Sequence, residues 1–180
     1  MKKFNIKNIN TDVYWDEHQT AVDFGLRQKK YLEIAGKGES IIELGCGLSP
    51  MLTFADKFTT KIGVDFSQET IKQASEIYKN VLYVLSDVLY TPFANETFDV
   101  VVSGEVIEHL EHPQLLINEM ERICKKGGIM ILSTPHLEFE DPEHLWEFDE
   151  EDFKEIGFET ESIKSDRFKG RSYIFAWKIK

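Results

Sequence analysis

A ten-residue segment near the start of the chain constrains the fold more than any other. Residues 41–50 read IIELGCGLSP, an apolar run that breaks into two glycines one residue apart. The apolar run favours a buried strand, whereas Gly45 and Gly47 let the backbone turn sharply and pass close to a ligand where a side chain would block it. Ser49 and Pro50 are typical of a helix start, as capping residue and first helical residue. The segment therefore predicts a buried strand that ends abruptly beside a ligand and leads into a helix.

Strand-like runs alternate with helix-like runs along the rest of the chain, which is typical of a parallel sheet covered by helices on both faces. The final run alternates large apolar residues with others and follows a turn-like KGR, so we expect it to pair antiparallel with the run before it. The expected strands are 40–44, 61–65, 81–85, 98–103, 128–134, 158–163 and 172–179. The sequence thus predicts an α/β fold with a Rossmann-like, doubly wound sheet of seven strands, mostly parallel with one antiparallel strand.

The chain has 180 residues, which fits one domain spanning its whole length. Ser67, Pro113 and Asp149 are the expected starts of further helices. Apolar residues at helical spacing in residues 1–35 predict an N-terminal helical lid, and residues 36–180 form the expected Rossmann-like core.

Charge and cysteine usage limit the expected partners. The 21 Lys and Arg residues against 32 Asp and Glu give a formal charge of −11, which repels nucleic-acid backbones and anionic lipid. A nucleic-acid substrate is disfavoured, although the stretch from Lys164 to Arg171 leaves local docking open. Two cysteines without CxxC spacing indicate a reducing compartment, and no stretch approaches the roughly 20 apolar residues of a membrane span. We expect a cytoplasmic protein that does not enter membranes.

Acidic and small residues follow the carboxyl ends of the successive expected strands. Asp65 ends the second strand, 18 residues after Gly47, where a doubly wound sheet places an acid to bind a ribose diol. The third strand ends in Ser86-Asp87, and the fourth in Ser103-Gly104-Glu105. Because such sheets bind ligands at this edge, we expect a nucleotide-type site there.

The glycine turn departs from the dinucleotide-binding pattern. Pro50 stands at the third glycine position of G-x-G-x-x-G. Glu43 flanks the turn, and its negative charge repels a diphosphate and attracts a cation. The expected ligand carries ribose and a positively charged group, and S-adenosylmethionine has both.

At these residues the sequence resembles the class I S-adenosylmethionine-dependent methyltransferases, over about residues 38–163. The shared motifs are E-x-G-C-G at 43–47, Asp65, SDV at 86–88, FDVVVSGEVIEHLEHP at 98–113 and KKGGIMILSTPH at 125–136. The resemblance implies that the glycine turn holds the methionine moiety, that the acid of the second strand binds the ribose, and that the acid after the third contacts the adenine amino group. Ser49 stands where many members have a third glycine, and a small capping residue fits there.

The opening NTDVYWD also resembles methyltransferases of polysaccharide and small-metabolite pathways, in which the tyrosine closes over the cofactor. The implied cofactor-binding residues are Tyr14, Glu43, Gly45, Cys46, Gly47, Asp65, Phe66, Asp87, Val88 and Gly104.

Methyl transfer from a sulfonium is an in-line displacement, so positioning can supply most of the catalysis. A base is needed only for a neutral hydroxyl or a protonated amine. The candidates near the carboxyl edge are Glu105, His109, His136 and His144, and we favour His136 because it directly follows the fifth strand. The expected acceptor is a small molecule, and the short segment over the site leaves room for a homodimer partner that completes it.

A metal site competes with this interpretation. Glu105, Glu108 and His109 stand at i, i+3 and i+4, and His136 or His144 can complete a shell for a divalent ion. Together with STPHLEF and HLWEFDEEDF, this spacing resembles the metal-dependent 2′-O-methyltransferases of small-RNA 3′ ends. The same short motifs recur in metal-free relatives acting on quinones and sugars, so we expect no metal site.

Two further alternatives come from other classes of protein. A nicotinamide oxidoreductase would share the fold, but the chain lacks the third glycine and a Tyr-x-x-x-Lys pair. A non-catalytic module that binds S-adenosylmethionine would show affinity without turnover.

Overall fold

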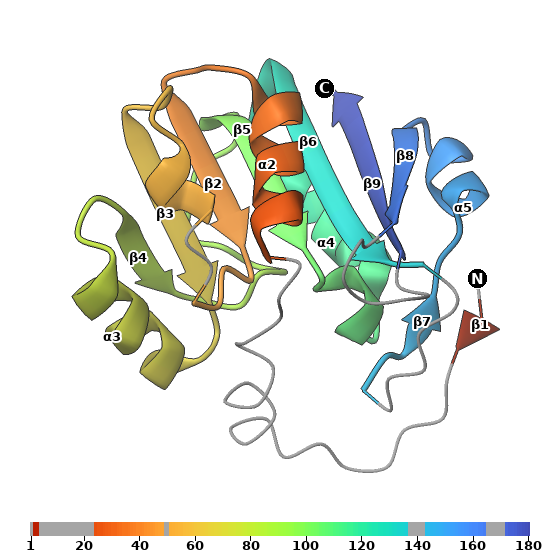
Figure 1. Cartoon of the computed structure of the whole chain (residues 1–180), viewed down its shortest axis with the longest axis horizontal. Coiled ribbons are helices and arrows are strands. Elements are labelled where there is room, and N and C mark those ends of the chain that lie inside the picture. The colour runs from red at the N-terminus through yellow and green to blue at the C-terminus, as the bar shows by residue number, and fades with distance from the viewer. Residues whose placement is uncertain (1, 4–23, 49–50, 137–142, 165–171) are drawn as a thin grey trace.

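The computed structural model describes residues 2–3, 24–48, 51–136, 143–164 and 172–180 (Figure 1). Its main sheet has seven strands in the order β4-β3-β2-β5-β6-β9-β8. The strand bounds are β2 Ser40–Leu44, β3 Thr60–Asp65, β4 Leu82–Leu85, β5 Phe98–Gly104, β6 Cys124–Pro135, β8 Glu159–Lys164 and β9 Ser172–Ile179. β9 pairs antiparallel with both β6 and β8, while the pairs among β4, β3, β2, β5 and β6 are parallel. The predicted fold class and its single antiparallel strand are confirmed.

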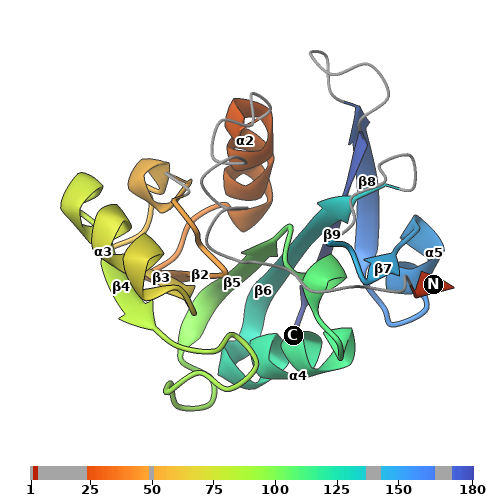
Figure 2. The ribbon, with the colours of Figure 1, turned by 90° about the horizontal axis from the view of Figure 1, so that it is seen from below.

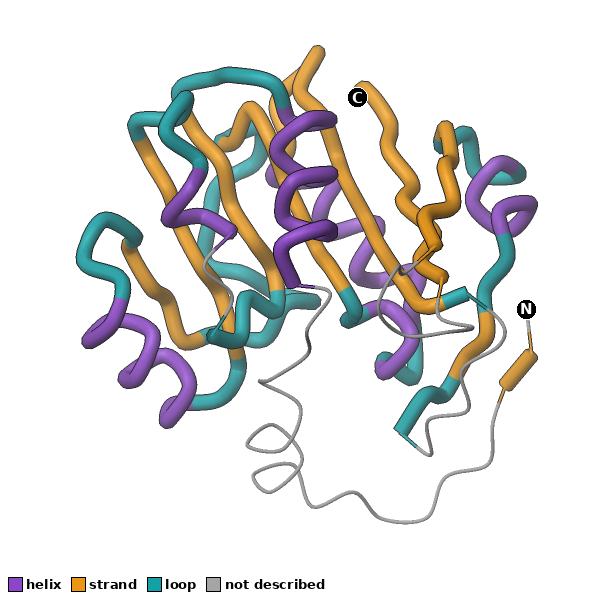
Figure 3. The backbone as a smooth tube through the Cα atoms, in the orientation of Figure 1, coloured by secondary structure: helices purple, strands orange, loops and turns teal. Residues whose placement is uncertain are grey.

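The central strands are apolar because helices cover both faces of the sheet. All five residues of β2 are buried, and successive residues point to opposite faces. Ile41 packs with the helix α2 (Phe24–Ala35) and the 3-10 turn η1 (Met51–Phe54). Ile42 packs with α4 (Pro113–Ile123) and α5 (Glu150–Lys154). Figure 2 shows α2 and α4 on opposite sides of the sheet, and Figure 3 shows the helices outside the layer of strands.

The predicted helix starts are confirmed where the structure describes them. The Ser67 hydroxyl accepts a hydrogen bond from the Thr70 backbone N–H at 3.2 Å and caps α3 (Gln68–Ile77). Pro113 opens α4, and Asp149 caps α5 through a capping box. The helix expected after Ser49 and Pro50 is reduced to η1, and these two residues lie outside the described part of the chain.

The structure differs from the predicted N-terminal lid in the final part of that segment. Residues 24–35 form α2, which packs on the sheet and buries Tyr31 and Ala35 in the core, so this helix belongs to the core layer. Residues 4–23 lie outside the described residues. β1 (Lys2–Lys3) pairs with β7 (Trp146–Glu147) in a small antiparallel sheet that the sequence did not predict. Among the described helices, none is long and apolar enough to cross a bilayer.

A buried carboxylate ties the loop between β4 and β5 to α4. Glu119 accepts hydrogen bonds from the Thr91 backbone N–H at 2.7 Å and from its hydroxyl at 2.5 Å. The Arg122 guanidinium donates to both oxygens of this carboxylate at 2.7 Å. Burial by itself raises the pKa of Glu119, but the bonds from Arg122 and Thr91 outweigh it and hold this pKa below its ordinary value. This attachment fixes the loop that begins with Asp87 and Val88.

Candidate active site

The glycine turn after β2 is held between two neighbouring segments. The N–H groups of Gly45 and Cys46 both donate to the Val64 carbonyl oxygen of β3, at 2.8 and 2.9 Å. Gly45 has a φ of +74° and Gly47 a φ of +51°, angles that favour glycine. A Cβ on Gly45 would also collide with the Val106 side chain, whereas a Cβ on Gly47 would meet no atom within 4 Å among the described residues. Gly45 is therefore required by both its backbone angle and its packing, and Gly47 by its angle alone.

Asp65 closes this turn from the end of β3. Its Oδ2 accepts from the Gly47 backbone N–H and its Oδ1 from the Ser67 backbone N–H, each at 2.9 Å. Burial raises the pKa of Asp65, and the backbone hydrogen bonds offset only part of that rise. A carboxylate has about four acceptor positions, so Asp65 retains the capacity to accept from a ligand hydroxyl.

The carboxyl ends of β2, β3, β4 and β5 surround a pocket of about 400 Å³. This volume lies in the range of roughly 300–1,000 Å³ typical of small-molecule sites. Phe66 stands at the pocket with 56% of its surface exposed, which makes a large ring accessible to a planar ligand. Residues that line the pocket are Gly45, Gly47, Asp65, Phe66, Asp87, Val88, Glu105, Val106, His109, Leu110 and Glu143. Most of the residues expected at the site are thus brought together.

Several expected residues lie elsewhere. Glu43 is buried within β2, and the Cys46 side chain faces Gly63 of β3, where burial raises the pKa of its thiol. A Cβ on Gly104 would collide with the Tyr31 side chain, so Gly104 serves the contact between β5 and α2. None of these three lines the pocket, and Tyr14 lies outside the described residues.

The structure also places His136, our favoured base, away from the pocket lining. Its backbone N–H donates to the Ser172 carbonyl oxygen at 2.9 Å, and it forms a β-bridge with Phe148. β6 continues past Ser133, which pairs with the last residue of β5, and carries His136 three residues further. At about 3.3 Å per residue, this extension moves His136 roughly 10 Å beyond the edge where β5 ends.

Glu105 lies at the pocket in a strained backbone conformation and a dense polar network. Its φ is +57°, in the left-handed region that costs a non-glycine residue about 1–3 kcal/mol. The Ser133 hydroxyl donates to Glu105 Oε1 at 2.6 Å, and Tyr31 is hydrogen-bonded to Ser133 at 2.5 Å. Arg27 Nη1 lies 3.2 Å from Glu105 Oε2. These partners fix the Glu105 carboxylate in place and balance its charge.

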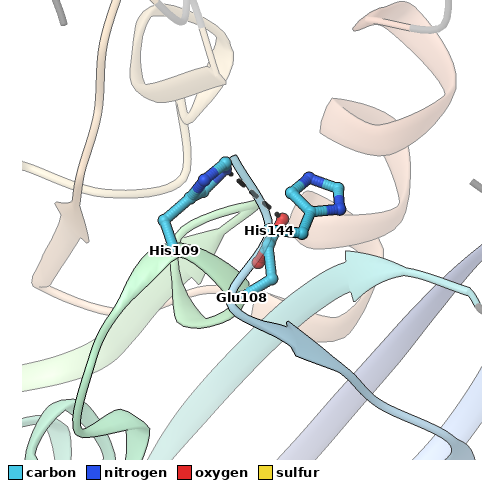
Figure 4. A group of neighbouring side chains, drawn as sticks. All are labelled: Glu108, His109 and His144. Carbon is cyan, nitrogen blue, oxygen red and sulfur yellow. Dashed lines mark ion pairs between the residues drawn. The ribbon is translucent and has the colours of Figure 1, made fainter. Parts of the chain in front are cut away.

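Three side chains with metal-binding atoms meet beside the pocket. The potential ligand atoms of Glu108, His109 and His144 all lie within 4.8 Å of one another, and we call these residues the Glu108–His109–His144 cluster. Figure 4 shows the Glu108 carboxylate directed toward the two imidazole rings. His109 belongs to the pocket lining, so the cluster adjoins the cavity.

Sequence reasoning missed the partners of Glu105. Ser133 lies near the end of the expected strand 128–134 and belongs to a quoted motif, so the rule that small residues gather at strand ends could have found it. Arg27 and Tyr31 gave no such signal, because only the packing of α2 on the sheet brings them to β5. Glu143 enters the site through its position beside η2 (Ile107–His109), which tertiary packing determines.

Comparison with known proteins identifies the family. The methyltransferase domain family matches residues 42–132. An uncharacterized protein of Methanocaldococcus jannaschii, MJ1123, is 27% identical over 168 residues, which cover 93% of this chain and 72% of that protein. The ubiquinone biosynthesis O-methyltransferase of Coxiella burnetii is 30% identical over 119 residues, which cover 61% of this chain but only 50% of that enzyme.

A solved structure supports the same fold. The crystal structure of an S-adenosylmethionine-dependent methyltransferase from Aquifex aeolicus matches with a TM-score of 0.70 at 17% identity, covering 92% of this chain and 97% of that one. The motif at β2, the acids at the strand ends and the family match over residues 42–132 agree with one another. The chain belongs to the class I S-adenosylmethionine-dependent methyltransferases, and its cofactor is S-adenosylmethionine.

Proposed function

We propose that the chain transfers the methyl group of S-adenosylmethionine to an oxygen or nitrogen atom of a small-molecule acceptor. The observation that carries this proposal is the pocket of about 400 Å³, in which Asp65, Phe66 and Asp87 lie on the same cavity as Glu105 and His109. A cofactor-binding half and a reactive half thus share one small cavity.

The cofactor half fits an adenosyl group with a positive charge. Asp65 would accept hydrogen bonds from the ribose hydroxyls, Asp87 would accept from the adenine amino group, and Phe66 would offer its exposed ring to the adenine. The bound cofactor supplies a methyl group on a positively charged sulfur. The acids around the glycine turn favour that charge, which agrees with a site that would repel a diphosphate.

The acceptor half holds a nucleophile opposite the methyl group, which is the main requirement of an in-line displacement. His109 Nδ1 lies 3.2 Å from the Glu143 carbonyl oxygen. A carbonyl oxygen only accepts, so Nδ1 is the protonated nitrogen and Nε2 presents the lone pair that can take a proton from an acceptor. Glu105 is held by Arg27 and Ser133, so its role is to orient the acceptor.

Methyl transfer tests this proposal directly. The protein is incubated with methyl-labelled S-adenosylmethionine and separate panels of phenols, alcohols, amines and short RNAs, and label transfer and S-adenosylhomocysteine release are measured. We expect transfer to a small hydroxyl or amine, lost in Asp65→Asn and kept in Asp56→Asn, whose exposed side chain is not part of the pocket lining. Transfer to RNA alone, or cofactor binding without transfer to any acceptor, would contradict the proposal and favour the RNA or binding-module alternative.

Assembly and location are separate parts of the proposal. We propose that two copies associate when the acceptor site is completed, and that the protein works in the cytoplasm, as its charge and cysteine usage favour. Light scattering with and without cofactor tests the first, and cell fractionation tests the second.

A further inference from the structure

Contrary to the expectation from the sequence that no metal is bound, we propose that the Glu108–His109–His144 cluster binds a divalent first-row transition-metal ion on the acceptor side of the pocket. Metal binding by the cluster stands independently of the reaction. The use of the ion, to hold an acceptor oxygen, rests on the proposed function.

The spacing of the cluster fits a shared ion. His109 Nε2 lies 4.0 Å from Glu108 Oε1, which is too far for a hydrogen bond. Two ligands that bind the same ion at about 2.0–2.2 Å lie about 3–4 Å apart, so this pair already has suitable geometry. The widest separation in the cluster, up to 4.8 Å, needs a side-chain adjustment of under about 1 Å to reach that range.

Glu108 brings a buried carboxyl group to the cluster. The residue is 1% exposed, and neither of its oxygens has a hydrogen-bond partner among the described residues. The buried Thr134 hydroxyl likewise makes no hydrogen bond among the described residues. A buried carboxylate is costly unless it is hydrogen-bonded, paired or bound to a metal, and a cation at this position supplies the missing balance.

The two histidines are held in position by main-chain contacts. The Glu143 carbonyl oxygen accepts from His109 Nδ1, which directs the Nε2 lone pair toward Glu108, the arrangement of a metal-bound histidine with an outer hydrogen bond. The Leu145 backbone N–H donates to the Glu108 carbonyl oxygen at 2.7 Å and fixes the segment that carries His144 against η2. His144 is 7% exposed, and its ring centroid lies 4.9 Å from that of His109.

The ligand types select the class of ion. Two imidazole nitrogens and one carboxylate oxygen suit Mn²⁺, Fe²⁺, Co²⁺ or Zn²⁺, whereas Mg²⁺ and Ca²⁺ prefer oxygen ligands alone. Three protein ligands leave coordination positions open, and His109 places them at the cavity. An ion there would lower the pKa of a bound hydroxyl, whose proton would pass to water, so His109 Nε2 would serve as a ligand in place of the base role given to it in the proposed function. The inference therefore favours oxygen over nitrogen as the methylated atom.

Titration with Co²⁺ tests the site without cofactor or acceptor. We expect one equivalent per chain, with visible absorption bands, in protein prepared without a polyhistidine tag. His144→Gln and Glu108→Gln should each weaken binding more than about tenfold. His112→Gln, which changes an exposed histidine near the same turn, should leave binding unchanged. Circular dichroism checks that each variant is folded, and His144→Gln keeps the test valid if Glu108→Gln does not fold. Absent stoichiometric binding, or equal binding by wild type and His144→Gln, would overturn the inference.

Chelation separates this inference from the proposed function. If methyl transfer falls at least tenfold after chelation and returns with Mn²⁺ or Co²⁺, both are supported. Transfer that chelation leaves unchanged overturns the catalytic use of the ion and leaves the proposed function standing. Stoichiometric Co²⁺ binding without transfer to any acceptor overturns the proposed function and leaves the metal site standing.

Discussion

Replacing Gly45 with alanine tests how the glycine turn is built. Gly45 has a φ of +74°, and a Cβ at this position would collide with the Val106 side chain. Gly47 offers a matched control two residues away, because its φ of +51° is also left-handed but a Cβ there meets no described atom within 4 Å.

The two substitutions should differ by the energy of that collision. A left-handed φ costs an alanine about 1–2 kcal/mol, so Gly47→Ala should lower the free energy of unfolding by about that amount. Overpacking adds about 1–3 kcal/mol, so Gly45→Ala should lower it by about 2–5 kcal/mol. Shortening the neighbour in Gly45→Ala/Val106→Ala should recover the overpacking cost but leave the backbone cost.

Urea unfolding of the wild type, the three single variants and the two double variants Gly45→Ala/Val106→Ala and Gly47→Ala/Val106→Ala measures these quantities. We expect a coupling energy of about 1–3 kcal/mol between Gly45→Ala and Val106→Ala. We expect no coupling between Gly47→Ala and Val106→Ala. Equal losses of unfolding free energy for the two glycine variants, or a coupling energy near zero between Gly45→Ala and Val106→Ala, would refute the close contact between Gly45 and Val106.

Three further substitutions probe the supports of the site. Glu119→Gln should lower the free energy of unfolding by about 3 kcal/mol at pH 7, against little change for the exposed Glu121→Gln. Hydrogen bonds from Arg122 and Thr91 outweigh burial and lower the pKa of Glu119. The stability difference between wild type and Glu119→Gln should therefore be full above the ordinary pKa of 4.5 and disappear as the pH falls through the folded-state pKa. Urea titrations at several pH values can follow this loss. Tyr31→Phe removes the hydrogen bond to Ser133 and should cost about 1 kcal/mol in the same assay, and an unchanged stability would contradict its role in the network. Phe66→Ala should weaken S-adenosylhomocysteine binding by about 1–3 kcal/mol in calorimetry without lowering stability, since the ring is 56% exposed, and unchanged affinity would show that the adenine lies elsewhere.

The sequence predicted the sheet well because its strands carry strong local signals. Near-continuous apolar runs mark strands buried on both faces, as β2 illustrates, and the alternating residues of β9 mark the antiparallel strand. The glycine turn, the acid that ends β3 and the acid that follows β4 were also predictable, because parallel topology brings the carboxyl ends of strands to one edge.

The remaining parts of the site depend on packing that no local pattern records. Arg27 reaches Glu105 because α2 lies on the sheet, whereas helical periodicity alone was equally consistent with a lid. His136 was expected at the edge, but pairing of β6 with β9 continues beyond the end of β5. His144 meets His109 because the Leu145 N–H bonds to the Glu108 carbonyl oxygen and the His109 ring bonds to the Glu143 carbonyl oxygen, across more than thirty residues of sequence.

Calorimetric titration with S-adenosylmethionine and S-adenosylhomocysteine tests the central claim most directly. We expect the wild type to bind both ligands in the micromolar range and Asp65→Ala to weaken binding at least about tenfold through loss of charged hydrogen bonds. Asp65→Asn keeps an oxygen that can accept from the Gly47 N–H, so this variant separates loss of the ligand contact from loss of the turn that Asp65 holds. Asp56→Asn serves as the exposed control. A folded wild-type protein that binds neither ligand, or an Asp65→Ala variant that binds as tightly as the wild type, would contradict the assignment of this pocket to the cofactor.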